Sequence, residues 1–174
     1  EILDTVEAHQ TAAGGKIYVH VVKTPIRNDE GEIIGTQGIF WNVTERKRIE
    51  EELNRERDLL RTLLNNTPDQ IYFKDAQSRF IRVSRGLLER FSTNRLEDII
   101  GKSDFDFFSE EHARAAYDDE QRIIRTGIPV LDKPEKETWP DGHETWALTT
   151  KMPMRNNDGV FLGNLFILRD KTAG

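Results

Sequence analysis

The stretch KMPMRNNDGVFLGNLFILRDKT, residues 151–172, decides the fold, because two strand-like segments flank the turn signal Asn157-Asp158-Gly159. The same pattern occurs earlier in the chain, since residues 7–44 align with residues 135–172 without a gap. The residues that are identical in the two copies include Glu7/Glu135, Gly14/Gly142, Lys23/Lys151, Pro25/Pro153, Arg27/Arg155, Asn28/Asn156, Gly31/Gly159, Gly35/Gly163 and Thr44/Thr172. The two copies are 128 positions apart, which is the length of a small domain plus a connector. A fixed spacing of this length indicates tandem modules.

The repeat predicts one whole module and only the C-terminal part of the module before it. Residues 1–43 are expected to be the last strands of the incomplete first module. Residues 44–64 are expected to form a connector helix, and residues 65–174 the complete module. The chain is therefore interpreted as a piece of a longer protein.

Composition narrows the function classes. The chain has 174 residues, 32% of them charged, and a formal net charge of −6 with basic and acidic residues interspersed. Nucleic-acid binding requires a clustered basic surface, so this charge pattern argues against a nucleic-acid partner. No apolar run approaches the roughly 18 residues of a membrane span, and a cytoplasmic location is expected. The absence of cysteine excludes disulfides, thiolate metal sites and chromophores linked covalently through cysteine.

The first part of the chain predicts a hairpin. Residues 16–22 (KIYVHVV) are β-branched and aromatic, as is typical of a strand. A turn is expected at residues 28–31, followed by a second strand over residues 33–43.

The connector changes character sharply to TERKRIEEELNRERDLLRTLL, which is typical of a helix. Thr44 is the expected N-cap, and Glu45 in the first turn complements the helix dipole. An apolar seam with heptad-type spacing, interrupted by Glu56, consists of Ile49, Leu53, Leu60 and Leu63. One narrow seam cannot bury itself, so we expect this helix to pair with its own copy as a homodimer. The alternative is a solitary, solvent-exposed linker helix.

The second module predicts strands over 70–75 and 79–84, a short helix over 85–91, and then a longer helix. Ser109 is the expected N-cap of that helix, and Gly127 the residue that ends it. Three strands follow, roughly over 129–139, 143–152 and 160–169, with hairpin turns at Asp141-Gly142 and Asn157-Gly159. An antiparallel sheet with its helices gathered on one face is an α+β fold.

This order, together with IYFKD…RFIRVS, IIGKSDFDFF (99–108) and the hairpin ending in DKT, resembles the PAS domain family. The resemblance covers nearly the whole chain and implies a five-stranded antiparallel sheet with helices on one face. It also implies that Asp170 and Thr172 form the Asp-x-Thr motif that ends many PAS cores, the PAC motif. In the first copy Asn42 and Thr44 occupy these positions, with Asn where Asp is usual. These four residues are the expected signal junctions.

The family resemblance implies a non-catalytic sensory and relay function. Such modules regulate histidine kinases of two-component systems, diguanylate cyclases and related effectors by changing the helices that flank the sheet. No phosphoacceptor helix, ATP-binding segment or cyclase motif is present in the sequence, so the chain itself is not expected to be an enzyme, and the effector is expected outside it. The alternative is an interaction or dimerisation module with a packed core and no ligand.

The ligand, if there is one, is not identified by the sequence. The candidates for lining the cavity are Phe105, Tyr117, Trp146 and Leu168. Flavin chemistry of the thiol-adduct type is excluded without cysteine. Leu168 occupies the position where flavin-binding members often have Gln, and this argues against FAD. His112 precedes the usual position of a haem ligand by three to five residues, which argues against a haem sensor.

Charged residues on the expected strands have two interpretations. Arg82, Arg85 or Lys151 could neutralise a small carboxylate or an acidic metabolite, but charged strand residues more often face solvent. Glu135 and Glu137 could form a catalytic pair, but alternating surface charges explain them better. No metal site is expected, since no His-His spacing of the required kind occurs.

Overall fold

The protein is described by a computed structural model for residues 1–171, so Thr172 of the expected junction lies outside the described residues. The chain forms two compact units, Glu1–Leu59 and Leu60–Gly174. Each unit is described by itself below.

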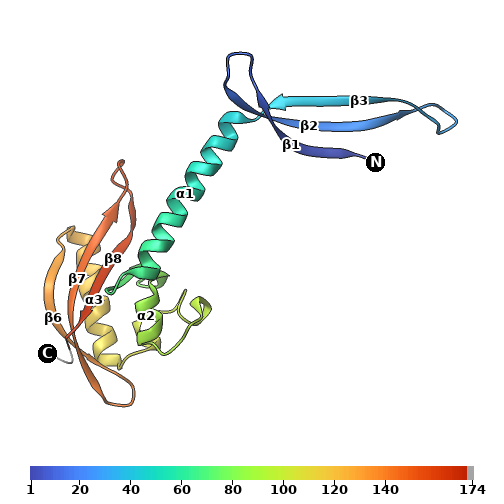
Figure 1. The fold of residues 1–174 in the computed structure, drawn as a ribbon. Coiled ribbons are helices and arrows are strands. Elements are labelled where there is room, and N and C mark those ends of the chain that lie inside the picture. Colours follow the sequence, from blue (N-terminus) through green and yellow to red (C-terminus); the bar gives the residue numbers. More distant parts are fainter. Residues whose placement is uncertain (172–174) are drawn as a thin grey trace. The chain divides into compact units, whose positions relative to one another are not determined.

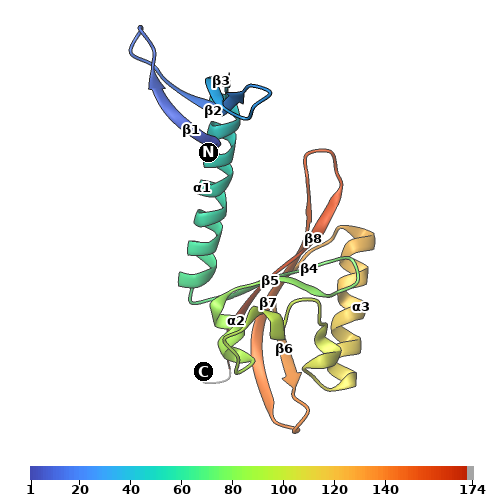
Figure 2. The same cartoon turned by 90° about the vertical axis from the view of Figure 1, so that its right-hand side faces the viewer.

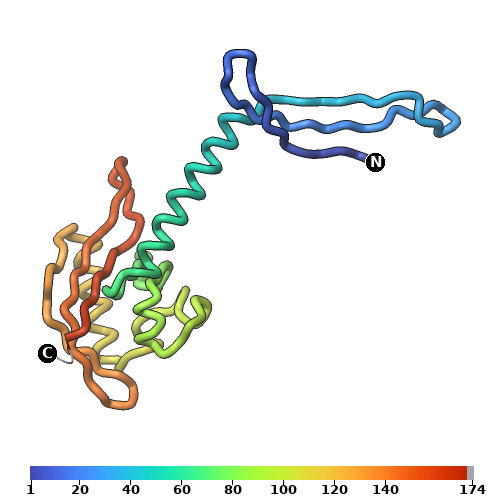
Figure 3. The backbone as a smooth tube through the Cα atoms, viewed as in Figure 1, coloured from blue at the N-terminus to red at the C-terminus, as the bar shows by residue number. Residues whose placement is uncertain are grey.

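The first unit contains a three-stranded antiparallel sheet in the order β1-β2-β3, followed by the start of helix α1 (Figure 3). The strands are β1 (Leu3–Gln10), β2 (Lys16–Arg27) and β3 (Ile33–Asn42). The two expected strands are confirmed, whereas β1 was not predicted. Its sequence, LDTVEAHQ, has few apolar residues, and its strand state depends on pairing with β2 along its whole length.

The repeat in sequence is also a repeat in structure. Arg27 Nη1 donates to the carbonyl oxygen of Gly31 at 2.7 Å, and Arg155 Nη1 donates to that of Gly159 at 2.9 Å. Both glycines have a left-handed backbone, with φ of 81° and 79°, which glycine adopts without steric cost. The identical arginines and glycines therefore stabilise the same turn twice.

Helix α1 spans Thr44–Asn66, two residues beyond the expected end. Asn42 Oδ1 accepts hydrogen bonds from the Thr44 backbone N–H at 2.9 Å and from the Thr44 hydroxyl at 2.6 Å. The Thr44 hydroxyl in turn accepts from the backbone N–H of Tyr18 at 2.9 Å. The expected junction residues Asn42 and Thr44 therefore connect the sheet to the first turn of the helix.

The second unit is an α+β domain with a five-stranded antiparallel sheet in the order β5-β4-β8-β7-β6, which confirms the expected fold class (Figure 1). Its strands are β4 (Gln70–Lys74), β5 (Phe80–Val83), β6 (Val130–Thr138), β7 (Glu144–Arg155) and β8 (Phe161–Asp170). Its helices are α2 (Arg85–Arg90) and α3 (Glu110–Thr126), with 3₁₀ turns η1 (Leu96–Asp98) and η2 (Asp104–Asp106) between them.

The long helix α3 runs along the sheet on the side that carries the core (Figure 2). Its expected caps are confirmed, because the Ser109 side chain accepts from the His112 N–H and Gly127 ends the helix with φ 72°. No helix in residues 1–171 is long and apolar enough to cross a membrane.

The core of the second unit joins the inward residues of the sheet to α2 and the segment after it. It consists of Tyr72, Phe80, Val83, Leu87, Ile99, Ala147, Phe166 and Leu168. The rings of Tyr72 and Phe166, from the neighbouring strands β4 and β8, stack with centroids 4.6 Å apart and planes 3° apart. Burying these side chains is the main favourable term in the folding of this unit.

Gly163 permits an especially close approach between β8 and β4. A Cβ atom placed on Gly163 would lie 2.7 Å from the backbone oxygen of Lys74, and its φ is 148°. Real Cβ atoms do not come so close to a carbonyl oxygen. The glycine therefore allows Lys74 and Asn164 to pair directly across the two strands.

Candidate functional site

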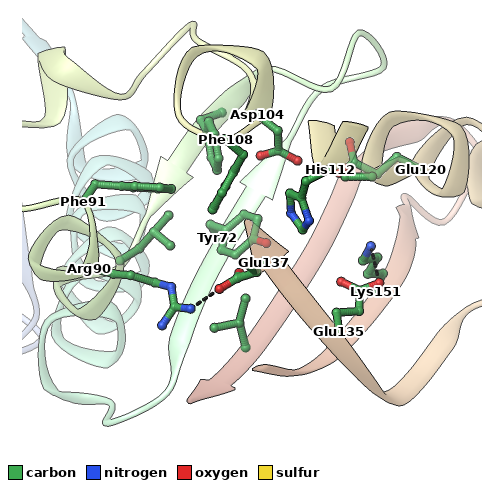
Figure 4. A pocket seen from close by; sticks show the side chains of 14 residues that line it. Tyr72, Arg90, Phe91, Asp104, Phe108, His112, Glu120, Glu135, Glu137 and Lys151 are labelled. Carbon is green, nitrogen blue, oxygen red and sulfur yellow. Dashed lines mark hydrogen bonds and ion pairs between the residues drawn. The ribbon is translucent and has the colours of Figure 1, made fainter. Parts of the chain in front are cut away.

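A small polar cavity lies between the inward face of the sheet and helices α2 and α3 (Figure 4). Its free volume is about 20 Å³, which is room for about one water molecule. The apolar and aromatic lining consists of Tyr72, Phe80, Leu87, Phe91, Phe108, Ala116 and Leu168. The ionisable lining consists of Arg90, Asp104, His112, Glu120, Glu135, Glu137 and Lys151. This lining differs from that of an apolar cavity, because half of the residues carry titratable groups.

A buried lysine with two carboxyl groups lies at one side of the cavity. Lys74 Nζ is 2.8 Å from Asp104 Oδ2 and 2.8 Å from Glu120 Oε1. Lys74 is only 1% exposed, and its ammonium lies 4.8 Å and 5.0 Å from the ring centroids of Phe80 and Phe166. Strand β4, turn η2 and helix α3 are thereby linked through one cation.

The electrostatics of this cluster raise the pKa of both the lysine and one of its two carboxyl partners. Burial opposes the charge of Lys74, but the nearby charges of Asp104 and Glu120 outweigh it and raise the pKa of the lysine. Burial raises the pKa of Glu120, and Asp104 adds to this effect although Lys74 opposes it. A single cation therefore does not compensate both carboxylates fully.

A second buried ion pair lies at the other side of the cavity. Arg90 Nη2 donates to Glu137 Oε2 and, at 3.0 Å, to the Thr145 hydroxyl. This hydroxyl donates to Glu137 Oε2 at 2.8 Å and accepts from Trp139 Nε1 at 3.0 Å. Both terminal nitrogens of Arg90 have hydrogen-bond partners, so the guanidinium and the carboxylate are held in a fixed orientation, although Arg90 Nε has no partner among residues 1–171.

Arg90 also reaches the end of the last strand. Its Nη1 donates to Asp170 Oδ2 at 3.3 Å. Asp170 is the last residue of β8 and one of the expected junction residues. One side chain therefore contacts both the wall of the cavity and the C-terminal end of the sheet.

A third network closes the cavity between β6, β7 and α3. Lys151 Nζ lies 2.9 Å from Glu135 Oε1 and 3.8 Å from Asp119 Oδ2. Lys133 lies 3.0 Å from the same Asp119 oxygen and 3.4 Å from Glu135 Oε1. Burial opposes the charge of Asp119, but the hydrogen bond from Lys133 and the charge of Lys151 outweigh it and lower the pKa of Asp119.

The expected cavity residues are placed at three different locations. Leu168 lines the cavity described above. Phe105 and Tyr117 line a second, smaller space of about 10 Å³ beside Asp104 and Glu120. Trp146 is 48% exposed and lies outside the lining, because it points to the opposite face of β7 from Ala147.

Two expectations for charged residues were wrong. Glu137 is not a surface charge, since it is 4% exposed and is bound to Arg90. Lys151 is 3% exposed, so it does not lie on the wet face of the sheet. Lys74 and Arg90 were not identified from the sequence at all. Among residues 1–171 no group of three or more His, Asp or Glu side chains is arranged to hold a metal ion.

The second unit is an α+β module with a small polar cavity between its sheet and its helices. A model of the PAS fold matches residues 64–173, and a model of the PAS domain matches residues 5–45. The first match covers more than half of the chain, so the chain belongs to the PAS family. A comparison with curated proteins gave no match.

Solved structures give the same fold. The chain is similar to Vibrio cholerae VqmA, a DNA-binding receptor. In the structure of VqmA bound to DPO the identity is 27% and the TM-score 0.56, over 64% of this chain and 56% of that one. It is also similar to a PAS domain from Colwellia psychrerythraea, at 17% identity and a TM-score of 0.57, over 70% of this chain and 99% of that one. A third similar structure is the PAS domain of Bordetella pertussis BvgS, at 18% identity and a TM-score of 0.55, over 68% and 88%. The chain spans about half the length of the VqmA chains.

Proposed function

We propose that this chain is a non-catalytic, cytoplasmic sensory and relay region, in which the cavity binds a small polar molecule and Arg90 transmits the change to the end of β8. The observation that supports this most directly is the double contact of Arg90, with Glu137 in the cavity wall and with Asp170 at the strand end. A ligand that competes for Arg90 or Glu137 changes both contacts together. The effector is then a domain outside this chain.

Three types of effector domain are considered for this region. A kinase or a cyclase is the expectation from the sequence. The similarity to VqmA, a receptor described with DNA, adds a DNA-binding domain as a further class of effector. In each case the signal leaves through the segment that follows Asp170.

The relay is tested by hydrogen exchange at the strand end. The Lys171 N–H donates to the Trp146 oxygen at 2.8 Å, and this bond depends on the position of Asp170. We expect Glu137→Gln to increase the exchange rate of the Lys171 amide by about fivefold or more, because the weaker pairing with Arg90 allows local opening. Exchange is measured by NMR on the whole chain.

The control is Glu135→Gln. It removes a carboxylate two residues earlier on the same strand, but Glu135 pairs with Lys151 and Lys133 instead of Arg90. We expect no change at Lys171 in this variant. Equal effects of the two variants would show that the strand end responds to general loosening, and the relay through Arg90 would then be abandoned.

We further propose that α1 forms a homodimer through its apolar seam. Ile49, Leu53 and Leu63 are 59%, 58% and 57% exposed, so the seam has apolar surface to bury in a parallel pair. The alternative, an interaction module without a ligand, is favoured by the small volume of the cavity. The homodimer is expected for both functions, so a test of the apolar seam does not distinguish the sensory region from the interaction module.

The seam is tested by Leu53→Glu, which introduces a charge at the centre of the paired surface. We expect sedimentation velocity to show a dimer for the wild-type chain and a monomer for this variant at the same concentration. Asn54→Glu is the control, since it introduces the same residue about 100° around the helix from Leu53, outside the apolar seam. A wild-type chain that remains monomeric at high micromolar concentration would contradict the dimer.

A further inference from the structure

The charges around the cavity do not balance. Its lining contains the carboxyl groups of Asp104, Glu120, Glu135 and Glu137. The cations that pair with them are Lys74, Arg90 and Lys151. Asp119, Lys133 and Arg122 extend one end of this network, and Asp170 extends the other end through Arg90, so these outer groups add two charges of each sign. One carboxyl group therefore remains without a full positive charge of its own, and it belongs to the pair that shares Lys74.

Two buried polar atoms at the cavity are also without a hydrogen-bond partner among residues 1–171. One is Arg90 Nε, a donor whose side chain is 7% exposed. The other is Glu120 Oε2, whose residue is 1% exposed. Buried polar atoms in native structures nearly always have a partner, and these two atoms lie on opposite sides of the cavity, so each of them indicates a bound molecule or water beside it.

His112 is oriented by a hydrogen bond to strand β6. Its Nδ1 lies 3.2 Å from the backbone oxygen of Lys136. A carbonyl oxygen only accepts, so Nδ1 carries the proton in this contact. The ring belongs to the lining of the cavity (Figure 4).

We propose that the cavity binds a small primary amine that also carries a neutral hydrogen-bond acceptor, such as an amino amide or an amino alcohol. The ammonium group compensates the excess carboxylate and donates to Glu120 Oε2. The neutral acceptor receives the hydrogen bond of Arg90 Nε and so draws the guanidinium away from Glu137, which is the competition that the proposed relay requires. A carboxylate ligand is disfavoured, because it would add to the negative excess in a site of low dielectric constant.

The free volume of about 20 Å³ holds about one water molecule, so a ligand of a few heavy atoms binds only when the cavity widens. His112 is only partly buried, so a change of its side-chain rotamer enlarges this space. The ring of Phe108 forms the apolar wall on that side, with its centroid 4.7 Å from that of His112. This inference rests on the proposed sensory function, since it names the ligand class of the same cavity.

The test compares three probes of similar size by thermal unfolding of the whole chain at pH 7.5. Glycinamide carries an ammonium group and a neutral acceptor, glycine is a zwitterion, and acetate is an anion. We expect glycinamide to raise the melting temperature by about 2–4 °C at a concentration near five times its Kd. Glycine is expected to give a smaller shift, and acetate none.

Variants locate the effect. Glu120→Gln is expected to abolish the shift with glycinamide, because the amide keeps the shape of the side chain but removes the excess charge. Glu111→Gln is the control, since Glu111 lies exposed in the first turn of the same helix and outside the cavity, and it is expected to keep the full shift. If Glu120→Gln does not fold, the wild-type shift is measured at pH 4.5, where protonation of Glu120 is expected to abolish it.

Three results would overturn the proposal. These are a larger shift with acetate than with glycinamide, no shift with any probe, or a full shift in Glu120→Gln. None of them changes the exchange experiment on Lys171, which uses no ligand. Failure of the ligand class is therefore distinguishable from failure of the relay through Arg90.

Discussion

Lys74→Met is expected to lower the free energy of unfolding of the second unit by about 3–5 kcal/mol. The lysine is 1% exposed and is the cation shared by Asp104 and Glu120. Methionine has a similar length but leaves two carboxyl groups facing each other without a cation. Removing one partner of a buried pair costs more than the pair contributes, because the remaining charge is buried without compensation.

Urea unfolding followed by far-ultraviolet circular dichroism measures this loss. Lys133→Met is the matched control, because Lys133 also pairs with two acidic residues but its side chain is 46% exposed. Exposed ion pairs contribute about 0–1 kcal/mol, so the control is expected to stay within this range. Equal losses in the two variants would contradict the importance of burial at Lys74.

A variant with Lys74→Met and Glu120→Gln together separates the charge from the packing. If the uncompensated carboxylates cause the loss, removal of one of them restores part of the stability. The double variant is therefore expected to be more stable than Lys74→Met alone. A double variant that is less stable would indicate that the aliphatic contacts of Lys74 dominate.

Gly163→Ala is the second substitution with a large expected effect, a loss of about 2–4 kcal/mol. The new Cβ would lie 2.7 Å from the Lys74 backbone oxygen, and φ of 148° is unfavourable for alanine. Strands β4 and β8 must then separate at the pair formed by Lys74 and Asn164. The same unfolding experiment measures the loss.

Gly86→Ala is the control within the same unit. Gly86 lies in helix α2, and a Cβ there would meet only Gln70 Cγ at 3.4 Å and more distant atoms. Alanine is favoured over glycine in helices by up to about 1 kcal/mol, so this variant is expected to be neutral or slightly more stable. If Gly163→Ala were equally harmless, the two strands would have more freedom to adjust than the structure indicates.

Local signals were sufficient to predict most of the elements. Ser109 and Gly127 delimit α3 because a side-chain cap and a left-handed glycine depend only on neighbouring residues. The turns that end in Gly31 and Gly159 were predicted for the same reason. Strand β1 was missed because its state depends on a partner strand, which its own sequence does not encode.

The charged groups of the cavity could not be predicted in this way. Strand β4 has apolar residues on both faces, with Ile71 and Phe73 alternating with Tyr72 and Lys74, so its pattern does not show which face is inward. Lys74 therefore resembles an ordinary surface lysine at the end of a strand. Its role depends on Asp104 and Glu120, which are 30 and 46 positions away, and only the tertiary fold brings these residues together.

Arg90 and Glu137 were missed for a related reason. An arginine in the last turn of a short helix and a glutamate in a strand of alternating charges are both common on surfaces. Among the expected site residues, Leu168 was selected from the family resemblance, as the residue at the position where flavin-binding members often have Gln, and it lines the cavity. Its inward neighbours are Phe166 and Asn164.

The duplicated hairpin creates a risk of misassembly during folding, because β2–β3 and β7–β8 carry the same turn and the same register irregularity. Exchange of such similar segments is a characteristic failure of repetitive chains. The two hairpins differ at a core position, because Gly38 of the first hairpin aligns with the buried Phe166 of the second. A hairpin with Gly38 in place of Phe166 leaves the ring of Tyr72 without its stacking partner and creates a void. This difference therefore disfavours the wrong hairpin in the core of the second unit during folding.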